Sequence, residues 1–535
     1  MELHDNNHHQ RGDPMLPQSL LPFQYEVDPT HSKLTALGGL PLFLDLMSGL
    51  GVIAGLRRHL AGPGDMHGWS VSDVVLALVL VNLAGGECVE DLHRLNADVG
   101  FGQVMGLANR AGYSRQQRRA LGRKLAKLKM RELPSKSAAF RRLEKFHDPE
   151  EEEEKARRRR RAEKTGKAKS YIQKPNALLK GLMAVQRQLV AAVQRRSMQA
   201  VATLDQDATL IETLKDEALY CYKKFKAYQP MNTYWAEQGL VLHSEFRDGN
   251  VPAGHEQLRV LQEALECLPE GVEKVYLRSD TAGYQVNLLK YCAEGGSERF
   301  GVIEFAVGVD VGDDFKKAVG EVGEDQWQPL KKQVGGERVE TGQQWAEVCF
   351  VPDWMRKKYG PQYRYLATRE PLRQLELPGV EQEQRELPFP TMQMGPADEK
   401  IPYKVFGVVT NRDLPGDEVI GWLRKRCGYS EQVHAVMKDD LAGGRMPSGK
   451  FGVNAAWWQV MVLALNLSEA MKRLVLGEGW TTKRLKALRF GLIHIGARVV
   501  KRSRQVWIRL SRGEAALELV NRAREKIRML AEAPG

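Results

Sequence analysis

Three acidic residues, far apart in the chain, each lie in a local pattern that could place a carboxylate in a reaction site. Asp207 lies in VATLDQDATLIE, Asp280 ends the segment KVYLRSD, and Glu431 lies within RKRCGYSEQVHAVMKDD. The first two patterns predict strand ends and the third predicts a helix. Hard cations such as Mg²⁺ need oxygen ligands, and a pair of them can stabilise both the attacking and the leaving oxygen of a phosphodiester. The three carboxylates therefore indicate chemistry on DNA.

Two aspartates compete for the first of these positions. Asp205 and Asp207 are two residues apart on one predicted strand, so their side chains face the same way. The pattern alone leaves both open as metal ligands, and an Asp at a strand end is also a common turn or cap residue. Asp280 has a similar alternative, since it could cap the helix that follows it.

A basic residue accompanies Glu431 in the predicted helix. Lys438 lies seven residues further on, about two helical turns, so the two side chains are expected to share one face. The carboxylate could complete a metal site while the ammonium reaches a nearby phosphate. The alternative is a solvent-facing helix pair with little effect on stability. His434, three residues past Glu431, could support the site from behind.

Several motifs, in the same order, resemble those of a known family: the DDE transposases of bacterial insertion sequences, specifically insertion-sequence family 1380. The resemblance runs from about Phe23 to about Ser511. It implies an RNase H-like catalytic domain, dependence on two Mg²⁺ ions for which Mn²⁺ can substitute, and cut-and-paste movement of a DNA element. The motifs are Leu204–Thr209, Phe246–Gly254, Arg278–Tyr284, Gly428–Leu441 and Asn454–Leu467.

The resemblance also assigns roles to single residues. The family's catalytic aspartate matches Asp207, directly before Ala208-Thr209, and Asp280 and Glu431 complete the catalytic and metal-binding set. The spacing of Glu431 and Lys438 resembles the Tyr–Arg–Glu–Lys signature of related transposases. The chain departs from this signature at Cys427, which stands where the signature has Arg.

The departure at Cys427 affects the contact with DNA. Cysteine cannot offer the charged fork with which a guanidinium holds a phosphate. We therefore expect Arg426 or Arg424 to make the phosphate contact, together with Lys438.

The expected partners follow from the same resemblance. They are double-stranded DNA, as terminal inverted repeats and as target, and a second copy of the chain in a synaptic dimer. One alternative is a catalytically silent DNA-binding regulator derived from a transposase. Another is a stand-alone nuclease of RNase H type, which would cut without preference for element ends.

The charge of the chain is concentrated in one segment. Residues 114–196 hold 26 Lys and Arg against 9 Asp and Glu, whereas the whole chain has a net charge of only +12. A surface of this kind is expected to meet a polyanion. We interpret the segment as a basic arm that follows the phosphate backbone, with a solvated linker as the alternative. Its most basic run is Arg157, Arg158, Arg159, Arg160 and Arg161.

The order of predicted elements indicates an α/β protein. Three strands, a helix, a strand and another helix after residue 197 give the order of an RNase H-like core, interrupted by a mostly-β subdomain and preceded by a helical N-terminal domain that would bind DNA. The predicted divisions are a loose lead-in (1–22), the helical domain (23–113), the basic arm (114–196), the core (197–310 and 401–480), the inserted β subdomain (311–400) and a C-terminal region (481–535).

The remaining patterns exclude some classes of protein. The scattered cysteines show no metal-site spacing, so we expect reduced thiols. The most apolar runs, Val74–Ala84 and Val453–Leu467, are too short to span a bilayer and are expected to be buried helices. No secretory pattern is present, which predicts a cytoplasmic protein without membrane contact. Three tryptophans of the insertion could stack on an extruded base, although core packing is the more common role: Trp327, Trp345 and Trp354.

Overall fold

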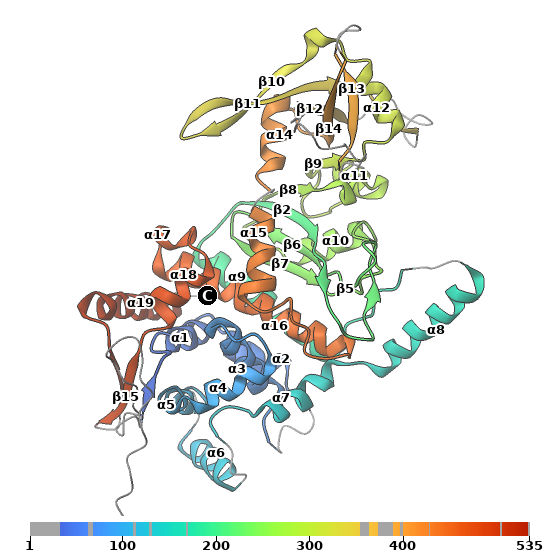
Figure 1. Ribbon diagram of the computed structural model, residues 1–535. Coiled ribbons are helices and arrows are strands. Elements are labelled where there is room, and N and C mark those ends of the chain that lie inside the picture. Colours follow the sequence, from blue (N-terminus) through green and yellow to red (C-terminus); the bar gives the residue numbers. More distant parts are fainter. Residues whose placement is uncertain are drawn as a thin grey trace, which may run out of the picture.

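The computed structural model describes most of the chain (Figure 1). The described residues are 33–62, 68–110, 114–127, 131–166, 170–353, 363–372, 389–395, 400–426, 429–502 and 505–532. A long central sheet runs through the upper part of the view, and helices from both ends of the chain surround one long helix, α16, in the lower part. The predicted lead-in, residues 1–22, lies outside the described residues.

The first helices form where the apolar spacing predicts them. Ser70 caps the N-terminus of α3, where its side chain accepts from Asp73 N–H and the Asp73 carboxylate accepts from Ser70 N–H. Gly51, with φ +75°, separates the first two helices. The helices are α1 (Pro41–Gly49), α2 (Val52–His59), α3 (Val71–Ala84), α4 (Leu92–Ala97) and α5 (Val99–Ala108), with a 3₁₀ turn η1 (Val89–Asp91) before α4.

These helices share a core with later parts of the chain. α1 packs against α19 (Glu514–Glu532), α2 against α9 (Ala177–Arg196), and α3 against α16 (Phe451–Ala470). Nearly every side chain of α3 and of α16 is buried, as expected for helices that are apolar all round. The prediction that the two most apolar runs are buried helices is confirmed. What the sequence did not reveal is that they bury each other.

The predicted basic arm contains ordered helices, and its end belongs to the core. Leu182, Val185 and Leu189 of α9 are fully buried, so the expectation of an arm or linker up to residue 196 is wrong for Ala177–Arg196. The apolar stripe of this segment outweighs its flanking arginines, because burying it requires packing against α2 and α16. The other helices of the region are α6 (Arg115–Lys127), α7 (Lys136–Leu143), η2 (Glu144–Phe146) and α8 (Pro149–Thr165).

Five strands form one end of the largest sheet. In spatial order they are β7, β6, β2, β8 and β9; β2 is antiparallel to β6 and parallel to β8, and β8 is parallel to β9. Helix α10 connects β7 to β8, and α11 connects β8 to β9. The bounds are β2 (Val201–Ala208), β6 (Met231–Trp235), β7 (Leu240–Glu245), α10 (Gln257–Cys267), β8 (Lys274–Ser279), α11 (Val286–Ala293) and β9 (Glu304–Val309).

The segment around Pro230 has one strand on each side of the proline. The chain does break there, but the strand before it, β5 (Lys226–Tyr228), belongs to a separate small sheet with β3 (Ile211–Glu212) and β4 (Leu219–Tyr220). The strand after the proline, β6, belongs to the central sheet. A tight turn after Trp235 connects it to the next strand of that sheet, β7. Proline has no N–H to donate, so it suits the break rather than a strand interior.

The predicted inserted subdomain is rich in strands but is not separate from the core. β14 pairs with β9, and β12, β11 and β10 continue the same sheet, with β13 also paired to β14. β14 begins at Ile401, in the predicted second part of the core, so the strands of the insertion itself join the sheet at β14. The insertion therefore extends the central sheet to ten strands instead of forming its own sheet, because an edge strand offers unpaired backbone groups. The bounds are α12 (Asp313–Gly320), η4 (Glu324–Gln326), β10 (Gln328–Val334), β11 (Glu337–Val348), β12 (Arg364–Pro371), β13 (Thr391–Met394) and β14 (Ile401–Thr410).

The last third of the chain is mostly helical and ends in a strand pair and a helix. β15 pairs on one side with β16 and on the other with β1, a short strand near the start of the described chain. The elements are α14 (Gly416–Arg424), α15 (Tyr429–Ala435), the π-helical turns η5 (Val436–Asp440), η6 (Met471–Leu476) and η7 (Arg489–Ile493), α17 (Glu478–Thr481), α18 (Leu485–Leu488), β1 (Leu34–Thr35), β15 (Ala497–Arg502) and β16 (Gln505–Leu510).

In the described part of the chain, no single helix is long and apolar enough to cross a membrane. One bent pair, Val71–Ala84 with Val89–Ala97, satisfies the length and composition requirement only when its two halves are combined, and the halves meet at 94°.

Candidate active site

Asp207 and Asp280 come together at one edge of the central sheet. β2 and β8 run parallel, and their last paired residues are Gln206 and Ser279. Asp207 and Asp280 each follow directly after these partners. The carboxyl ends of parallel strands are where α/β proteins assemble sites. The structure therefore brings together the first two predicted carboxylates.

The Asp280 carboxylate does two things at this edge. Its Oδ1 accepts from the Ala282 N–H at 3.0 Å, which caps the 3₁₀ turn η3 (Thr281–Gly283). The capping alternative is thus correct, but a carboxylate has two oxygens and can cap a turn and bind a cation at once. Burial raises the pKa of Asp280, and the neighbouring charge of Asp207 raises it further. A cation between the two carboxylates would relieve that repulsion.

A glycine on the next strand permits this geometry. Gly308 of β9 has no side chain, and a Cβ placed there would lie 3.0 Å from the Thr281 nitrogen and 3.2 Å from the Asp280 carbonyl carbon. The approach of β9 to the Asp280 backbone therefore needs glycine at this position.

Two basic side chains face Asp207. Nη1 of Arg426 lies 3.1 Å from Oδ2 of Asp207, and Nδ1 of His434 lies 3.8 Å from the same oxygen. Arg426 is 9% exposed, so its guanidinium lies among protein atoms and not out in solvent. Arg426 also acts to lower the pKa of Asp280. The cation that we predicted would contact a phosphate thus lies beside the first carboxylate.

A chain of hydrogen bonds connects His434 to the core. Nδ2 of Asn232, directly opposite Asp207 on β6, lies 3.4 Å from Nε2 of His434. The Asn232 oxygen accepts from the Ser244 hydroxyl at 2.6 Å, and the Ser244 hydroxyl accepts from the Trp458 indole N–H at 2.8 Å. Since the Asn amide can only donate through Nδ2, His434 accepts at Nε2 and presents Nδ1–H toward Asp207. The sequence gave no sign of Asn232, because cross-strand register depends on long-range pairing.

Asp205 is part of a buried ion pair. Its two oxygens accept from Nε and Nη2 of Arg278 at 2.6 and 2.7 Å, and Nη1 of Arg278 donates to the Trp422 carbonyl at 2.9 Å. Burial raises the pKa of Asp205, and the Arg278 guanidinium opposes this effect. Asp205 and Arg278 are register partners on β2 and β8, so their ion pair fastens together the two strands that carry Asp207 and Asp280.

The helix that carries the third predicted carboxylate lies next to these strands. Glu431 is in α15, and His434 of the same helix reaches both Asp207 and Asn232, in agreement with the placement of α15 in Figure 1. The Glu431 side chain and Cys427 lie outside what the structure describes. The predicted segments therefore converge, with the Asp207 and Asp280 side chains and the α15 backbone in one place.

Lys438 is placed differently from the prediction. It lies in the π-helical turn η5 and not in a regular α-helix. A π turn closes its hydrogen bonds one residue later than an α turn, so it rotates the following side chains around the axis. The seven-residue spacing from Glu431 therefore does not put Lys438 on the same face by α-helical geometry. The Lys438 side chain is half-buried.

The other predicted DNA-contact residues lie away from the two carboxylates. Nη1 of Arg424, at the end of α14, donates to Gln343 of β11 at 2.6 Å. The five arginines predicted to follow DNA (Arg157, Arg158, Arg159, Arg160 and Arg161) are all exposed on α8, which projects from the body in Figure 1.

Helix α8 is fixed at its base. Nζ of Lys155 lies 3.1 Å from both carboxylate oxygens of the buried Asp248, in the loop after β7. The basic run is therefore carried on an anchored helix. Several of its charges are already paired within the helix: Arg157 and Arg158 with Glu154, and Arg159 with Glu163.

Two of the three tryptophans of the insertion pack inside the protein. Trp327 is 6% exposed, with the guanidinium of Arg369 over its ring at 4.3 Å. Trp345 is 8% exposed and lies so close to Gly416 that any side chain there would overlap its ring. The core-packing alternative is therefore correct for both, and Trp354 lies outside the described residues.

In the part of the chain that the structure describes, the side chains that could bind a metal ion do not form a complete site. There, no group of three or more His, Cys, Asp and Glu side chains is arranged to hold a metal ion. Asp207 and Asp280 supply two carboxylates of the kind that hard divalent cations prefer. A third ligand would have to come from α15, whose Glu431 side chain is not described.

Comparison with known proteins identifies the family of this chain. A solved structure described as the cryo-EM structure of piggyBac transposase synaptic complex with hairpin DNA is similar to this chain, with 10% sequence identity and a TM-score of 0.39, over 94% of this chain and 84% of that chain. No curated protein matches. A family model described as "Transposase DDE domain group 1" matches residues 24–357 and 397–532. Because this match spans most of the sequence, the chain belongs to the DDE-domain transposase family, group 1.

Proposed function

We propose that this transposase binds the ends of its own insertion sequence and catalyses metal-dependent cleavage and transfer of DNA strands, in the manner of insertion-sequence family 1380. The observation that carries the proposal is the meeting of Asp207 and Asp280 at the ends of two parallel strands, beside the helix that contains Glu431. Asp207, Asp280 and Glu431 lie in segments separated by up to about two hundred residues, and nothing in their local sequences requires these segments to meet. A shared site would explain why they do.

We also propose that the catalytic core is RNase H-like. The proposal is supported by the strand order β7-β6-β2-β8-β9, in which three antiparallel strands are followed by two parallel strands, each reached through a helix. This is the arrangement that the order of predicted elements suggested. In this core Asp207 lies on the central strand β2, and Asp280 follows directly after its parallel neighbour β8.

Asp207, Asp280 and Glu431 are carboxylates of the kind that would suit a pair of Mg²⁺ ions, for which Mn²⁺ could substitute. Asp207, Asp280 and Glu431 would hold the metal, and the repulsion that raises the pKa of Asp280 favours a cation there. Bound divalent metal lowers the pKa of coordinated water and neutralises charge on the phosphate. Arg426 neutralises Asp207 when the metal is absent, and its guanidinium can turn to a phosphate oxygen when the metal takes over that carboxylate.

His434 would act by positioning Asp207. Asn232 contacts the ring at Nε2 and is itself held by Ser244, so Nδ1–H faces the carboxylate from 3.8 Å away. Polar neighbours of a metal ligand commonly orient it. Lys438 follows in the π turn and would contact the DNA backbone near the site.

The partners are part of the proposal. They are double-stranded DNA, as terminal inverted repeats and target, and a second copy of the chain that holds the other element end. The basic residues of α8 would provide salt-dependent affinity for the DNA backbone. The N-terminal helices are proposed to contribute to end recognition, although they are packed into the common core.

The experiment is an in-vitro cleavage assay on a duplex that contains one end of the element with its flanking DNA. We expect nicking that requires Mg²⁺ or Mn²⁺ and that is lost in Asp207→Asn, Asp280→Asn and Glu431→Gln, while binding to the same duplex persists. Asp310→Asn is the matched control, because Asp310 is exposed and follows the neighbouring strand β9.

The outcomes separate the alternatives. Binding without cleavage by the unaltered protein would favour a catalytically silent regulator. Cleavage without preference for the element end would favour a stand-alone nuclease. Cleavage that persists in Asp280→Asn would remove Asp280 from the site.

A further inference from the structure

The small C-terminal sheet presents one face to solvent. Its strand order is β1-β15-β16, and β15 and β16 pair from Ala497–Leu510 to Arg502–Gln505. Residues directly opposite each other share a face, as do residues two apart on one strand. The solvent face therefore consists of Leu34, Arg498, Val500, Arg502, Gln505, Trp507 and Arg509.

The charged side chains of this face are all basic: Arg498, Arg502 and Arg509. Residues 497–512 contain six Lys and Arg and no Asp or Glu. Arg498, Arg502 and Arg509 are exposed, and none of them forms an ion pair with a carboxylate in the described part of the chain. Helix α8 differs, because several of its arginines are paired with glutamates of the same helix.

The register places two of these charges directly against each other. Arg498 of β15 is the cross-strand partner of Arg509 of β16. Like charges directly opposite one another destabilise a strand pair. In the described part of the chain, no carboxylate pairs with Arg498 or Arg509 to offset this cost. The two arginines are therefore suited to binding a polyanion.

An exposed tryptophan lies between the arginines. Trp507 is 54% exposed and is the cross-strand partner of Val500, one step along the same face from the Arg498–Arg509 pair. An open aromatic ring on a sheet, flanked by cations, is the arrangement that binds nucleic-acid strands through base stacking and phosphate contacts.

The opposite face of this sheet packs against the protein core. Ala497 and Val499 are buried there, and α5 packs against β15. Gly38 lies so close that an added Cβ would be 2.9 Å from the Ala497 Cβ. The solvent face is thus held in place by the core.

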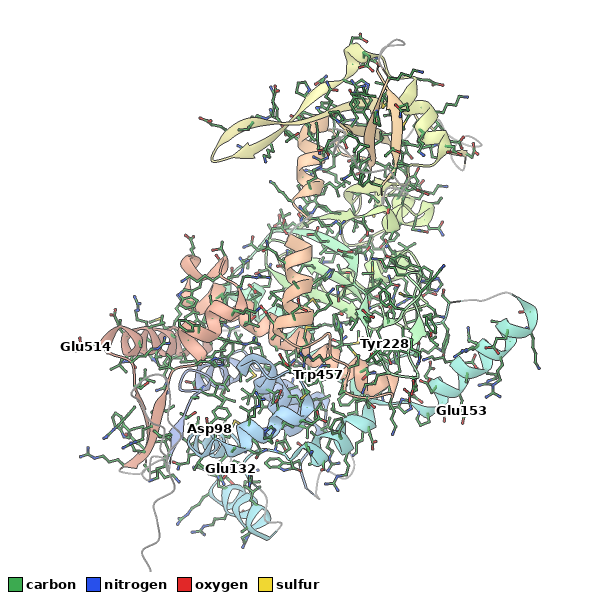
Figure 2. All side chains as sticks on the ribbon, in the orientation of Figure 1. Asp98, Glu132, Glu153, Tyr228, Trp457 and Glu514 are labelled. Carbon is green, nitrogen blue, oxygen red and sulfur yellow. The ribbon has the colours of Figure 1, made fainter. Side chains whose placement is uncertain are left out.

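We propose that this face binds a DNA strand, with Arg498, Arg502 and Arg509 on phosphates and Trp507 stacked on an unpaired base. The proposal rests on the proposed function, since it assumes a DNA substrate, but it adds a binding surface distinct from the site at Asp207 and Asp280. The sheet lies on the opposite side of the molecule from α8: in Figure 2, Glu514, which starts α19 just after β16, and Glu153 of α8 lie at opposite edges.

The test compares two triple variants of the full-length chain. One carries Arg498→Gln, Arg502→Gln and Arg509→Gln. The control removes the same charge from exposed arginines of the adjacent α19, each of which has an acidic partner: Arg522→Gln, Arg524→Gln and Arg528→Gln.

Binding is measured by fluorescence anisotropy with a single-stranded oligonucleotide and with a duplex of equal length, across a range of salt concentrations. Each lost phosphate contact lowers the slope of log K against log salt by about 0.7 for a single strand. We expect the face variant to lose about 2 from this slope and the α19 variant to lose much less.

Substitutions of Trp507 test the stacking role. Trp507→Ala should weaken single-strand binding by about 5- to 150-fold, from the usual range of base–aromatic stacking. It should affect the duplex less, and Trp507→Phe should retain most of the affinity. Circular dichroism and the thermal midpoint establish that each variant is folded.

Several outcomes would overturn the inference. Equal losses in the face variant and the α19 variant would mean that only net charge matters. A Trp507→Ala protein that changes its oligomeric state with unchanged DNA binding would make the face a contact between copies of the chain. If the unaltered protein binds neither the single strand nor the duplex, the proposed function fails as well. If the unaltered protein binds DNA but the face variant loses no more affinity than the α19 variant, this inference alone fails.

Discussion

Replacing Asp205 with alanine would separate the structural aspartate of β2 from the catalytic one. Asp205 is 2% exposed, and Arg278, its partner, is 4% exposed. The substitution removes two charge-assisted hydrogen bonds, of 2.6 and 2.7 Å. The Arg278 guanidinium keeps its hydrogen bond to the Trp422 carbonyl but loses its counter-ion. A buried charge without its counter-ion is the costly outcome, and the lost bonds themselves contribute less.

The expected cost is about 3–5 kcal/mol of unfolding free energy, the range for breaking one side of a buried ion pair. Asp207→Ala should cost less, since the Asp207 side chain is 20% exposed and its contact with Arg426, at 3.1 Å, is longer than those of Asp205 with Arg278. The two aspartates are two residues apart on one strand, so the difference arises from their partners and not from strand propensity.

The assay is urea-induced unfolding without divalent metal, followed by tryptophan fluorescence, with free energies from linear extrapolation. The double variant Asp205→Ala/Arg278→Met should recover about 2 kcal/mol or more relative to Asp205→Ala, because an apolar side chain replaces the stranded charge. Below the unfolding transition, Asp205→Asn should still cleave DNA, whereas Asp207→Asn should not.

The reasoning would be refuted by a loss of less than about 1 kcal/mol in Asp205→Ala, or by additive losses in the double variant, since neither fits a coupled buried pair. Loss of cleavage in a stably folded Asp205→Asn protein would instead place Asp205 among the metal ligands.

Two further predictions concern pH. Although burial alone would lower the pKa of His243, contacts with Cys267 and Glu263 raise it to about 9, so the stabilisation from its charged form is present below its unfolded pKa of about 6.5 and is lost as pH rises through 9. Unfolding free energy measured at pH 6 and pH 10 should therefore fall by at most about 3 kcal/mol, and His243→Gln should remove that dependence; an unchanged pH profile in the variant would contradict the assignment. Arg426→Gln should shift the acidic limb of the cleavage pH profile upward, because Arg426 lowers the pKa of Asp280 and a protonated carboxylate cannot bind metal; a downward shift would contradict this role.

Local patterns in the sequence identified the elements that carry the site. Alternating and helical spacing predicted β2, β8 and the helix of Glu431, and uniformly apolar runs predicted α3 and α16, because periodicity depends only on near neighbours. The family motifs selected Asp207 over Asp205, which local geometry had left open. The environment of Asp205, closed off by Arg278, provides a physical reason for that choice.

The tertiary structure decided which of these elements meet. Nothing in the sequence of β6 indicates that Asn232 lies opposite Asp207, nor that Arg498 lies opposite Arg509, because strand register is set by pairing across long stretches of chain. The same reason explains the errors: the insertion continues the central sheet from β14, and the end of the basic segment is a core helix. Composition determined that the protein is basic and globular, but only the packing determined which arginines are paired and which remain open to a partner.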